Sequence, residues 1–258
     1  MGYVGIRDLL LLVPFLLSDG GVSPKGANGW LIYFRNNDKI LINYFIKFLN
    51  KVTQNKIQVQ TKKDGSYFVR VNDKELGKKL LKLSLSFRTQ PCNMHPVCPG
   101  YRKYGLCKST TIDGRYHKII LPEEFVKYEK IQKLFLRIYF TCDGGISVIS
   151  SNTRYPFLVR KVFVNIKHPT LRKDFYKLLV VAGFNPKVYS EQIRLTTQED
   201  LIKFYRTIGF VEGVKISNHS KKFVGFEKNN LLRLLVNSYI NPRKLIMLTS
   251  VRNKKALS

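Results

Sequence analysis

Two aspartates end two apolar stretches of the sequence, and a pair of glycines follows each of them. The stretches are LLVPFLLSDGG, from Leu11 to Gly21, and LFLRIYFTCDGG, from Leu134 to Gly145. Each pattern predicts an apolar helix that ends at a carboxylate, Asp19 or Asp143, where glycine lets the chain turn into a strand. If the two helices pack side by side, the carboxylates meet at their shared end and repel each other unless a cation lies between them.

A hard divalent cation suits such a pair of carboxylates. Mg²⁺ or Mn²⁺ takes carboxylate oxygens and water as ligands. In that position the ion activates water and stabilises the leaving oxygen of a phosphodiester. The residue types therefore predict a metal-assisted phosphodiester hydrolase, in which the apolar helices form an interface and their ends carry the chemistry.

The charge of the chain points to a polyanionic partner. The 258 residues include 45 Lys and Arg against 17 Asp and Glu, which gives a formal net charge of +28. This field favours nucleic acid first and an anionic membrane second. A lysine-rich proteome is the alternative explanation, but such proteomes raise Glu along with Lys.

Neither a membrane span nor a secretory signal fits the N-terminal region. The longest apolar run, Leu9 to Leu17, is about half of the roughly 20 residues that a transmembrane helix needs. Asp8 cancels the charge of Arg7, and SDGGVS is a poor cleavage site. Four cysteines are too few for a secreted disulfide scaffold. The sequence predicts an intracellular, cytoplasmic protein.

The elements after the two aspartates are alike, although Asp19 and Asp143 lie 124 residues apart. The first half continues with a short extended piece (Val22 to Lys25), a strand in WLIYFRN, a helix in DKILINYFIKFLNKV capped by Asp38, a hairpin in KIQVQTKKDGSYFVRVN and a helix in DKELGKKLLKLSLSF. The second half continues with strands over residues 145–150 and 157–165, a helix in HPTLRKDFYKLLVVAGF, a hairpin in KVYSEQIRLT and a helix in QEDLIKFYRTIGF.

This order predicts an α+β fold of two pseudo-symmetric, tandem αββαββα units. Each unit should have an antiparallel sheet with helices on one face and a polar, basic face left free. In the hairpins, alternation predicts that Val59 and Val188 point toward the buried face.

We expect residues 1–90 to form a first half-domain, residues 91–122 a connector rich in Cys and Pro, and residues 123–258 a second half-domain with a basic tail. Four connector residues follow the pattern C-x2-H-x2-C-x8-C. Thiolates and imidazole are the ligands that Zn²⁺ prefers, but the spacing matches no standard zinc finger. A zinc site, a disulfide and a plain buried loop therefore stay open for Cys92, His95, Cys98 and Cys107.

The stretches LVPFLLSDG (Leu12 to Gly20) and LRIYFTCDG (Leu136 to Gly144) resemble the two copies of the LAGLIDADG motif. Over nearly its whole length the chain resembles a single-chain, two-motif LAGLIDADG homing endonuclease of the archaeal, intron-encoded type. The resemblance implies a monomer whose two sheets saddle the major groove of double-stranded DNA. It also implies cleavage of both strands across the minor groove, leaving short 3′ overhangs.

The same resemblance assigns metal ligands. It implies that Asp19 and Asp143 bind the catalytic divalent metal and that the backbone carbonyls of Ser18 and Cys142 help to hold it. The chain departs from the family where the small residues near the start of each motif are replaced by Val13-Pro14 and Arg137-Ile138. Pro14 should kink its helix, at a cost of about 3 kcal/mol, and Arg137 places a large charged side chain where a tight helix seam is expected.

Family members carry polar or basic residues at the end of the second strand, close to the cut. The matching pairs are Arg35-Asn36 and Ile166-Lys167. We expect Lys167, and after it Arg35, to orient water or to stabilise the transition state, and Lys215 in GVKIS is a further candidate. A plain phosphate contact is the alternative role for each of them.

Outward positions of the two hairpins are the candidates for reading DNA, because Arg suits guanine and Gln suits adenine in the major groove. A solvated strand face and contacts to phosphate alone are the alternatives. The candidates are Gln58, Gln60, Lys62, Arg70, Lys187, Gln192 and Arg194.

Two other functions compete with DNA cleavage. A LAGLIDADG maturase would bind its intron RNA and aid splicing without cutting DNA, and a basic DNA-binding regulator could use the same repeat. The pair of acids favours cleavage, because metal-assisted hydrolysis needs it and RNA binding does not.

Overall fold

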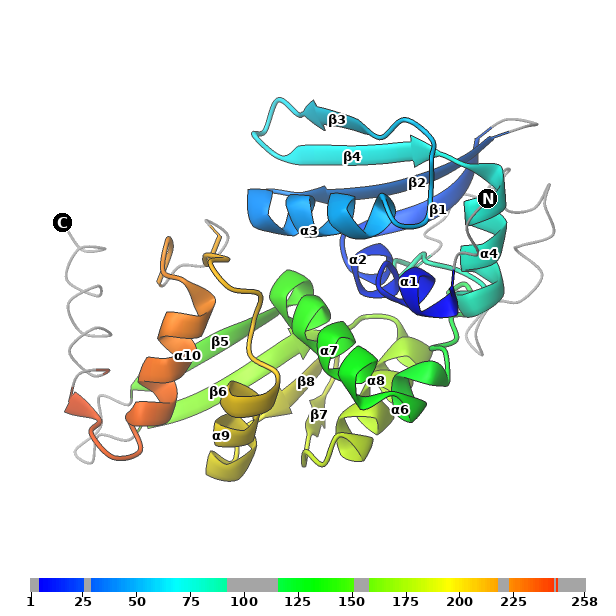
Figure 1. Cartoon of the computed structure of the whole chain (residues 1–258). Helices are drawn as coiled ribbons and strands as arrows, with labels where there is room; N and C mark the ends of the chain where they lie inside the picture. The colour runs from blue at the N-terminus through cyan, green and yellow to red at the C-terminus, as the bar shows by residue number, and fades with distance from the viewer. Residues whose placement is uncertain are drawn as a thin grey trace.

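The structure is a computed structural model of the chain that describes residues 5–25, 29–91, 116–150, 158–217, 223–243 and 245. Its first unit runs from α1 to α4 (Figure 1). The elements of this unit are α1 (Ile6–Leu10), α2 (Val13–Leu17), β1 (Gly20–Lys25), β2 (Gly29–Asn36), α3 (Lys39–Leu49), β3 (Gln58–Thr61), β4 (Tyr67–Asn72) and α4 (Lys74–Ser84).

The second unit repeats this order after a short leading helix and adds a helix at its end. Figure 1 shows it beside the first unit, with α7 next to α2. Its elements are α6 (Glu124–Lys127), α7 (Glu129–Asp143), β5 (Gly144–Ser150), β6 (Leu158–Asn165), α8 (Pro169–Val181), β7 (Lys187–Tyr189), β8 (Gln192–Leu195), α9 (Gln198–Thr207) and α10 (Lys228–Asn237).

Both sheets are antiparallel and have the same topology. Their strand orders are β1-β2-β4-β3 and β5-β6-β8-β7. The register also corresponds, because Gly20 pairs with Phe34 as Gly144 pairs with Val164. The predicted α+β fold of two tandem αββαββα units is therefore confirmed.

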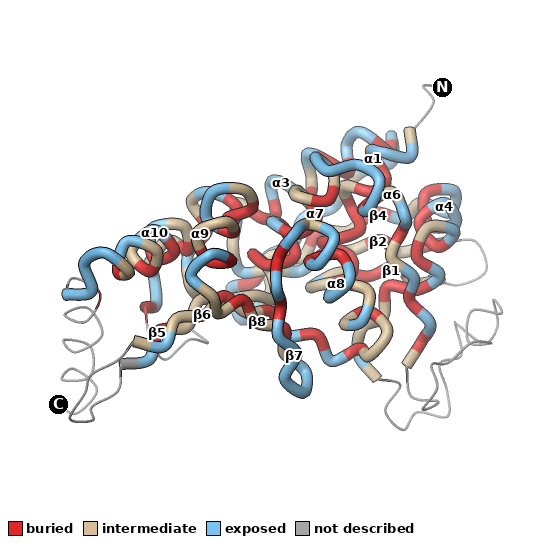
Figure 2. The backbone as a smooth tube through the Cα atoms, turned by 90° about the horizontal axis from the view of Figure 1, so that it is seen from below, coloured by how far each residue is buried: buried red, intermediate tan, exposed pale blue. Residues whose placement is uncertain are grey.

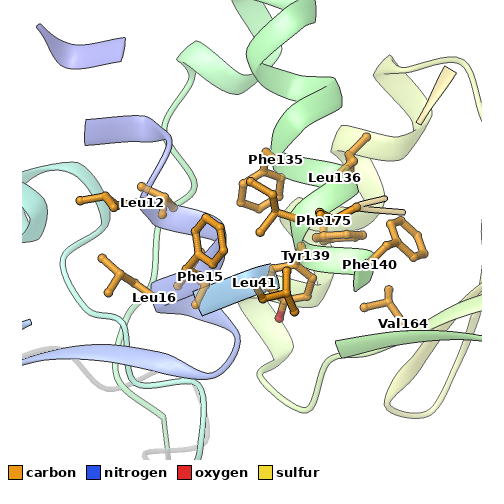
Figure 3. Packing of buried hydrophobic residues seen from close by; sticks show 14 of the residues in the cluster. Leu12, Phe15, Leu16, Leu41, Phe135, Leu136, Tyr139, Phe140, Val164 and Phe175 are labelled. Atoms are coloured by element: carbon orange, nitrogen blue, oxygen red, sulfur yellow. The ribbon is translucent and has the colours of Figure 1, made fainter. Parts of the chain in front are cut away.

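Each motif helix sends aromatic side chains into the core of its own unit. The Phe15 ring lies 5.5 Å from that of Phe45 on α3, and the Tyr139 ring lies 5.0 Å from that of Phe175 on α8. These pairs occupy corresponding places in the two units. Figure 3 shows the two groups of side chains on either side of the contact between the motif helices. Aromatic pairs of this kind stabilise a core beyond the area that they bury.

The predicted kink at Pro14 is confirmed. The first motif helix is divided into α1 and α2, with Leu11 and Leu12 in a turn between them. Proline has no N–H with which to continue the helix, so hydrogen bonding resumes when Leu16 N donates to Leu12 O at 3.1 Å. The second motif helix, α7, is continuous over 15 residues.

The expectation for Arg137 was wrong. Its side chain is exposed rather than set in the helix seam, and its Nε donates to Ile208 O at 2.6 Å. The neighbouring residue Ile138 is fully buried in its place. The helical periodicity turns Arg137 toward the segment after α9, so its charge stays out of the interface.

The expected burial of Val59 and Val188 was also wrong. These side chains are 51% and 50% exposed, although their partners Val69 and Ile193 are fully buried. Both valines lie on the outermost strand of a sheet, which the helices that cover the inner strands do not reach. Figure 2 shows β7 and its turn as exposed. Alternation gives the direction of a side chain but not the extent of the helix layer.

In the part of the chain that the structure describes, no helix combines the length and the apolar character that crossing a membrane requires. The helix α10 was missing from the predicted repeat. It packs on β5 and α9, and Leu231, Leu232 and Leu235 form its buried side.

Candidate active site

The ends of the two motif helices meet. The Ser18 hydroxyl and the Cys142 thiol form a side-chain hydrogen bond between the two motif turns. The charge of Asp19 raises the pKa of Asp143, as expected for carboxylates that lie near each other. Two residues that are 124 positions apart thus share one end of the helix pair.

Glycine is required directly after each acid because the backbone passes too close for a side chain. A Cβ on Gly20 would lie 2.6 Å from Tyr33 O and 2.8 Å from Phe15 O. A Cβ on Gly144 would lie 2.5 Å from Phe140 O. These contacts are shorter than van der Waals separation, so the helix end, the acid and the following strand pack together only with glycine at this position.

Asp19 is exposed, and its hydrogen-bond donor comes from its own unit. The Asn36 Nδ2 at the end of β2 donates to Asp19 Oδ2 at 2.7 Å. Loss of hydration raises the pKa of Asp19, while the Asn36 hydrogen bond and the charge of Lys228 oppose this rise. Asn36 therefore orients the carboxylate and favours its ionised form.

Asp143 lies in a more enclosed place. Its pKa is raised to about 8, first by loss of hydration and then by the charge of Asp19. A hydrogen bond from Tyr139 and the charge of Lys228 act in the opposite direction. Tyr139 is fully buried one helical turn before Asp143, and burial keeps its own pKa well above the usual value, so its hydroxyl is the donor.

These oxygen atoms suit a hard divalent cation. The two carboxylates come with backbone carbonyls at the same helix ends, which is the chemistry that Mg²⁺ and Mn²⁺ prefer. Loss of hydration and the charge of Asp19 raise the pKa of Asp143, and a bound cation would stabilise its ionised carboxylate. Among the described residues, no group of three or more His, Cys, Asp and Glu side chains gathers to hold a metal.

A cavity of about 800 Å³ opens beside Asp19, between the first unit and the segment after α9. Arg35 and Lys215, two of the three predicted basic residues, line it. The Lys215 backbone N donates to Asp38 Oδ2 at 3.3 Å, which joins the two units at the cavity wall. The Arg35 guanidinium forms an ion pair with Asp64 and donates from Nε to Ser66 Oγ at 2.8 Å.

Lys167 is exposed and does not line this cavity. The strand register also changes its counterpart in the first unit. Arg35 pairs with Phe68 as Asn165 pairs with Gln192, so Arg35 corresponds to Asn165 and Lys167 corresponds to Asn37. The predicted match between Arg35-Asn36 and Ile166-Lys167 was therefore wrong by one residue.

The seven predicted DNA-reading residues lie on the two sheet faces that the helices leave free, or at their margin. Cross-strand pairing places Gln58 beside Arg70 and Lys187 beside Arg194. The Arg70 Nε donates to Gln58 Oε1 at 2.8 Å. Gln60 and Gln192 lie on the same faces, and Lys62 directly follows β3.

These free faces are more aromatic than predicted. The Arg194 guanidinium lies 4.1 Å from the Tyr189 ring centroid, and the Lys62 Nζ lies 4.6 Å from that of Phe68. Another pair, Lys161 with Phe163, was missed, although the alternation of β6 could have indicated it. Basic groups held over rings are suited to contacting a nucleic acid.

The four zinc candidates, Cys92, His95, Cys98 and Cys107, lie outside the described residues. Cys142 is a free cysteine, and burial raises the pKa of its thiol well above the usual value. It is therefore a neutral packing group beside Asp143 and not a thiolate nucleophile.

Three polar residues of the site were missed. Asn36 was considered only as the neighbour of Arg35, although its place at the end of β2 was a usable signal. Tyr139 stands one helical turn before Asp143, which also predicts contact. Lys228, at the start of α10, contacts the second motif turn, and nothing in its local sequence distinguishes it from the other basic residues.

A search with protein-family models finds no match, and a search of curated proteins also finds none. Solved structures do match. Meganuclease I-SmaMI bound to uncleaveable DNA has a TM-score of 0.52 and 10% identity, over 96% of this chain and 93% of that chain. LAGLIDADG meganuclease I-AabMI bound to uncleaved DNA has a TM-score of 0.52 and 12% identity, over 96% of each chain. A mutant of I-SmaMI has a TM-score of 0.53 and 9% identity, over 95% of this chain and 98% of that chain. The chain therefore has the LAGLIDADG homing endonuclease fold, as its two motif stretches predict.

Proposed function

We propose that the protein is a site-specific DNA endonuclease of the LAGLIDADG homing type, which hydrolyses both strands of a double-stranded target with a divalent metal. The finer properties implied by the resemblance are part of the proposal. They are an intron-encoded, archaeal enzyme that acts as a monomer, cuts across the minor groove, leaves 3′ overhangs and uses Mg²⁺.

The observation that carries the proposal is that Asp19 and Asp143 lie near each other at the contact between α2 and α7, in a fold whose two free sheet faces bear basic groups. Carboxylates alone would repel a phosphate backbone. The basic faces supply the attraction, and the acids supply the ligands for a cation at the point where the two units meet.

In this proposal the two acids, with the carbonyls of Ser18 and Cys142, hold the metal. When bound, the metal lowers the pKa of a water molecule and stabilises the leaving oxygen. Asn36 fixes the Asp19 carboxylate and Tyr139 fixes that of Asp143.

The basic side chains have separate roles. Lys215 and Arg35, from the cavity wall, contact the phosphate near the cut. The arginines, glutamines and lysines of the free faces hold the duplex on both sides and read its bases.

Cleavage of DNA that carries the intronless insertion locus tests the proposal. We expect a double-strand break with Mg²⁺ that EDTA prevents and that Asp19→Asn or Asp143→Asn abolishes. Asp174→Asn on α8, which makes the same chemical change away from the site, should cut at the wild-type rate. Cleavage that survives both active-site substitutions contradicts the proposal. Splicing of an intron RNA without any cut in DNA would favour the maturase instead.

A further inference from the structure

Lys228 is a buried lysine whose ammonium lies against the second motif turn. It begins α10 and is only 8% exposed. Its Nζ donates to Thr141 O at 2.6 Å and to Gly144 O at 3.0 Å. These two carbonyls flank Cys142 and Asp143, so one side chain holds the backbone on both sides of the second acid.

The end of α7 is a suitable place for a cation. The last carbonyls of a helix have no N–H partner within the helix, and its dipole favours positive charge at this end. The segment after α9 also holds α7 at a second level, where Val211 N donates to Thr141 Oγ1 at 2.9 Å. The hydrogen bonds of Val211 and of Lys228 together join the chain that follows α9 to the end of the motif helix α7.

Burial of an ammonium group is costly unless it is paired. Loss of hydration lowers the pKa of Lys228, and the charges of Asp143 and Asp19 oppose this change. The ammonium also lies near an aromatic ring, with Nζ 5.5 Å from the Phe210 centroid. Methionine could fill this space without the cost of burying a charge, so the hydrogen bonds to the turn are what the lysine specifically provides.

The first motif turn is held differently. Ser18 Oγ donates to Pro14 O at 2.9 Å, and Asp19 O accepts from Arg35 N at 3.1 Å, so both contacts come from the first unit. In residues 5–91 and 116–243, as far as they are described, no lysine or arginine side chain bridges the carbonyls around Asp19.

We propose that Lys228 is a positioning residue for the second half of the metal site, because it fixes the Cys142 carbonyl and the Asp143 carboxylate as one rigid pair. It acts through the backbone of the turn. The inference rests on the proposed function, since it assigns Lys228 to the same metal site.

Binding of Mn²⁺ to the DNA-free protein tests this role without a cleavage assay. The electron paramagnetic resonance signal of free Mn²⁺ falls as the ion binds, so a titration gives the dissociation constant. Groups that hold metal ligands in place typically contribute about 10–100-fold in affinity for the metal. We expect Lys228→Met to weaken Mn²⁺ binding by about tenfold or more. Arg137→Met is the matched control and should leave the affinity within about twofold, because it removes a long cation of α7 that bonds Ile208 O but touches neither turn carbonyl.

The outcomes separate the two proposals. An unchanged or tighter Mn²⁺ dissociation constant in a folded Lys228→Met protein overturns the positioning role. If this variant does not fold, Lys228→Leu, which also removes every donor to the turn, replaces it, and an unchanged constant is again decisive. Wild-type protein that binds no more Mn²⁺ than the Asp19→Asn/Asp143→Asn double variant contradicts the proposed metal site itself.

Discussion

The two motif turns have the same backbone and different surroundings. Asp19 follows a helix that Pro14 divides, is exposed, and takes its partner from strand β2. Asp143 follows a continuous helix and is more enclosed. It takes its partner from its own helix, and the later helix α10 holds its turn.

This difference shows how two copies of one fold give two carboxylates with different pKa values. The glycine contacts and strand register that set the turn are shared, while the side chains around it are not: Phe15 stands where Tyr139 does, and Asn36 stands where Ile166 does. Environments that push two neighbouring pKa values apart allow one carboxylate to ionise before the other. Without metal, Asp143 is the acid that retains its proton to higher pH.

The largest expected effect tests whether the two cores are equivalent. Phe45→Ala and Phe175→Ala remove corresponding rings that pack against the motif helices. Each should lower the free energy of unfolding by about 3–5 kcal/mol, because a large cavity is left. Urea unfolding measures both. The control is Tyr176→Ala, a ring on α8 that is already 36% exposed and should cost much less. A cost below about 1 kcal/mol at either buried position would contradict the equivalence.

A second prediction concerns the pH dependence of stability in EDTA. The folded pKa of Asp143 is about 8 against an ordinary value of 3.8, so the folded state binds the extra proton between these values. The stability associated with this proton is present below about pH 4 and is lost as pH rises through about 8. Asp143→Asn removes this dependence, so the variant should gain about 1–3 kcal/mol over wild type between pH 5 and pH 9, after allowance for solvent screening. Urea unfolding at these two pH values measures the gain.

Asp19→Asn sharpens this comparison. The pKa of Asp19 is also raised, so the sign is the same, but its exposure and its Asn36 partner should make the gain smaller. Equal gains for the two variants would show that the turns are not electrostatically different. Added Mn²⁺ should reduce the gain of Asp143→Asn at pH 9, because a cation then stabilises the ionised carboxylate of the wild type.

Local sequence patterns predicted most of the fold. The order of helices and hairpins and the Asp38 cap follow from periodicity and turn residues that lie within a few positions of each other. The pairing of the acids needed only the assumption that two similar apolar helices meet. Neighbouring residues in the sequence determine features of this kind, and tertiary contacts do not alter them.

The errors came from contacts between distant segments. Val164 lies twenty positions after its partner Gly144, whereas Phe34 lies only fourteen positions after Gly20. The residue that corresponds to Lys167 therefore depends on the length of the connection between two strands, which no local sequence pattern gives. The burial of Lys228 depends on α10 docking on β5. Lysine is almost never fully buried unless it is paired, and its partners here are backbone carbonyls that carry no sequence signature.

The next prediction compares DNA contacts in the two units. Arg70 and Arg194 occupy corresponding positions, but only Arg194 is stacked on a ring, that of Tyr189. Each Arg→Ala change should weaken binding of the target duplex by about 1–3 kcal/mol if the arginine reads a base. The effect should be larger at 194, because the stacked guanidinium is held in place before binding. Fluorescence anisotropy at several salt concentrations measures it. If both variants instead weaken all sequences alike and reduce the salt slope by about 1, the arginines contact phosphate only.

The smallest expected effect compares the caps of the closing helices α4 and α9. Asp73 Oδ1 accepts from Leu76 N at 2.9 Å and its other oxygen accepts from the Thr53 hydroxyl, whereas Thr197 Oγ1 accepts from Asp200 N at 3.1 Å. Loss of a cap costs about 0.5–2 kcal/mol. Each change also breaks a second hydrogen bond, since Thr53 loses its acceptor in Asp73→Ala and the Asp200 carboxylate loses the Thr197 hydroxyl donor in Thr197→Ala. Asp73→Ala should lie nearer the upper end of this range than Thr197→Ala, because it alone removes a negative charge from a helix N-terminus. Thr197→Ser, which keeps the hydroxyl, is the control for thermal unfolding. A larger loss at Thr197 than at Asp73 would mean that α9, through its contact with α10, has the greater part in holding the second unit together.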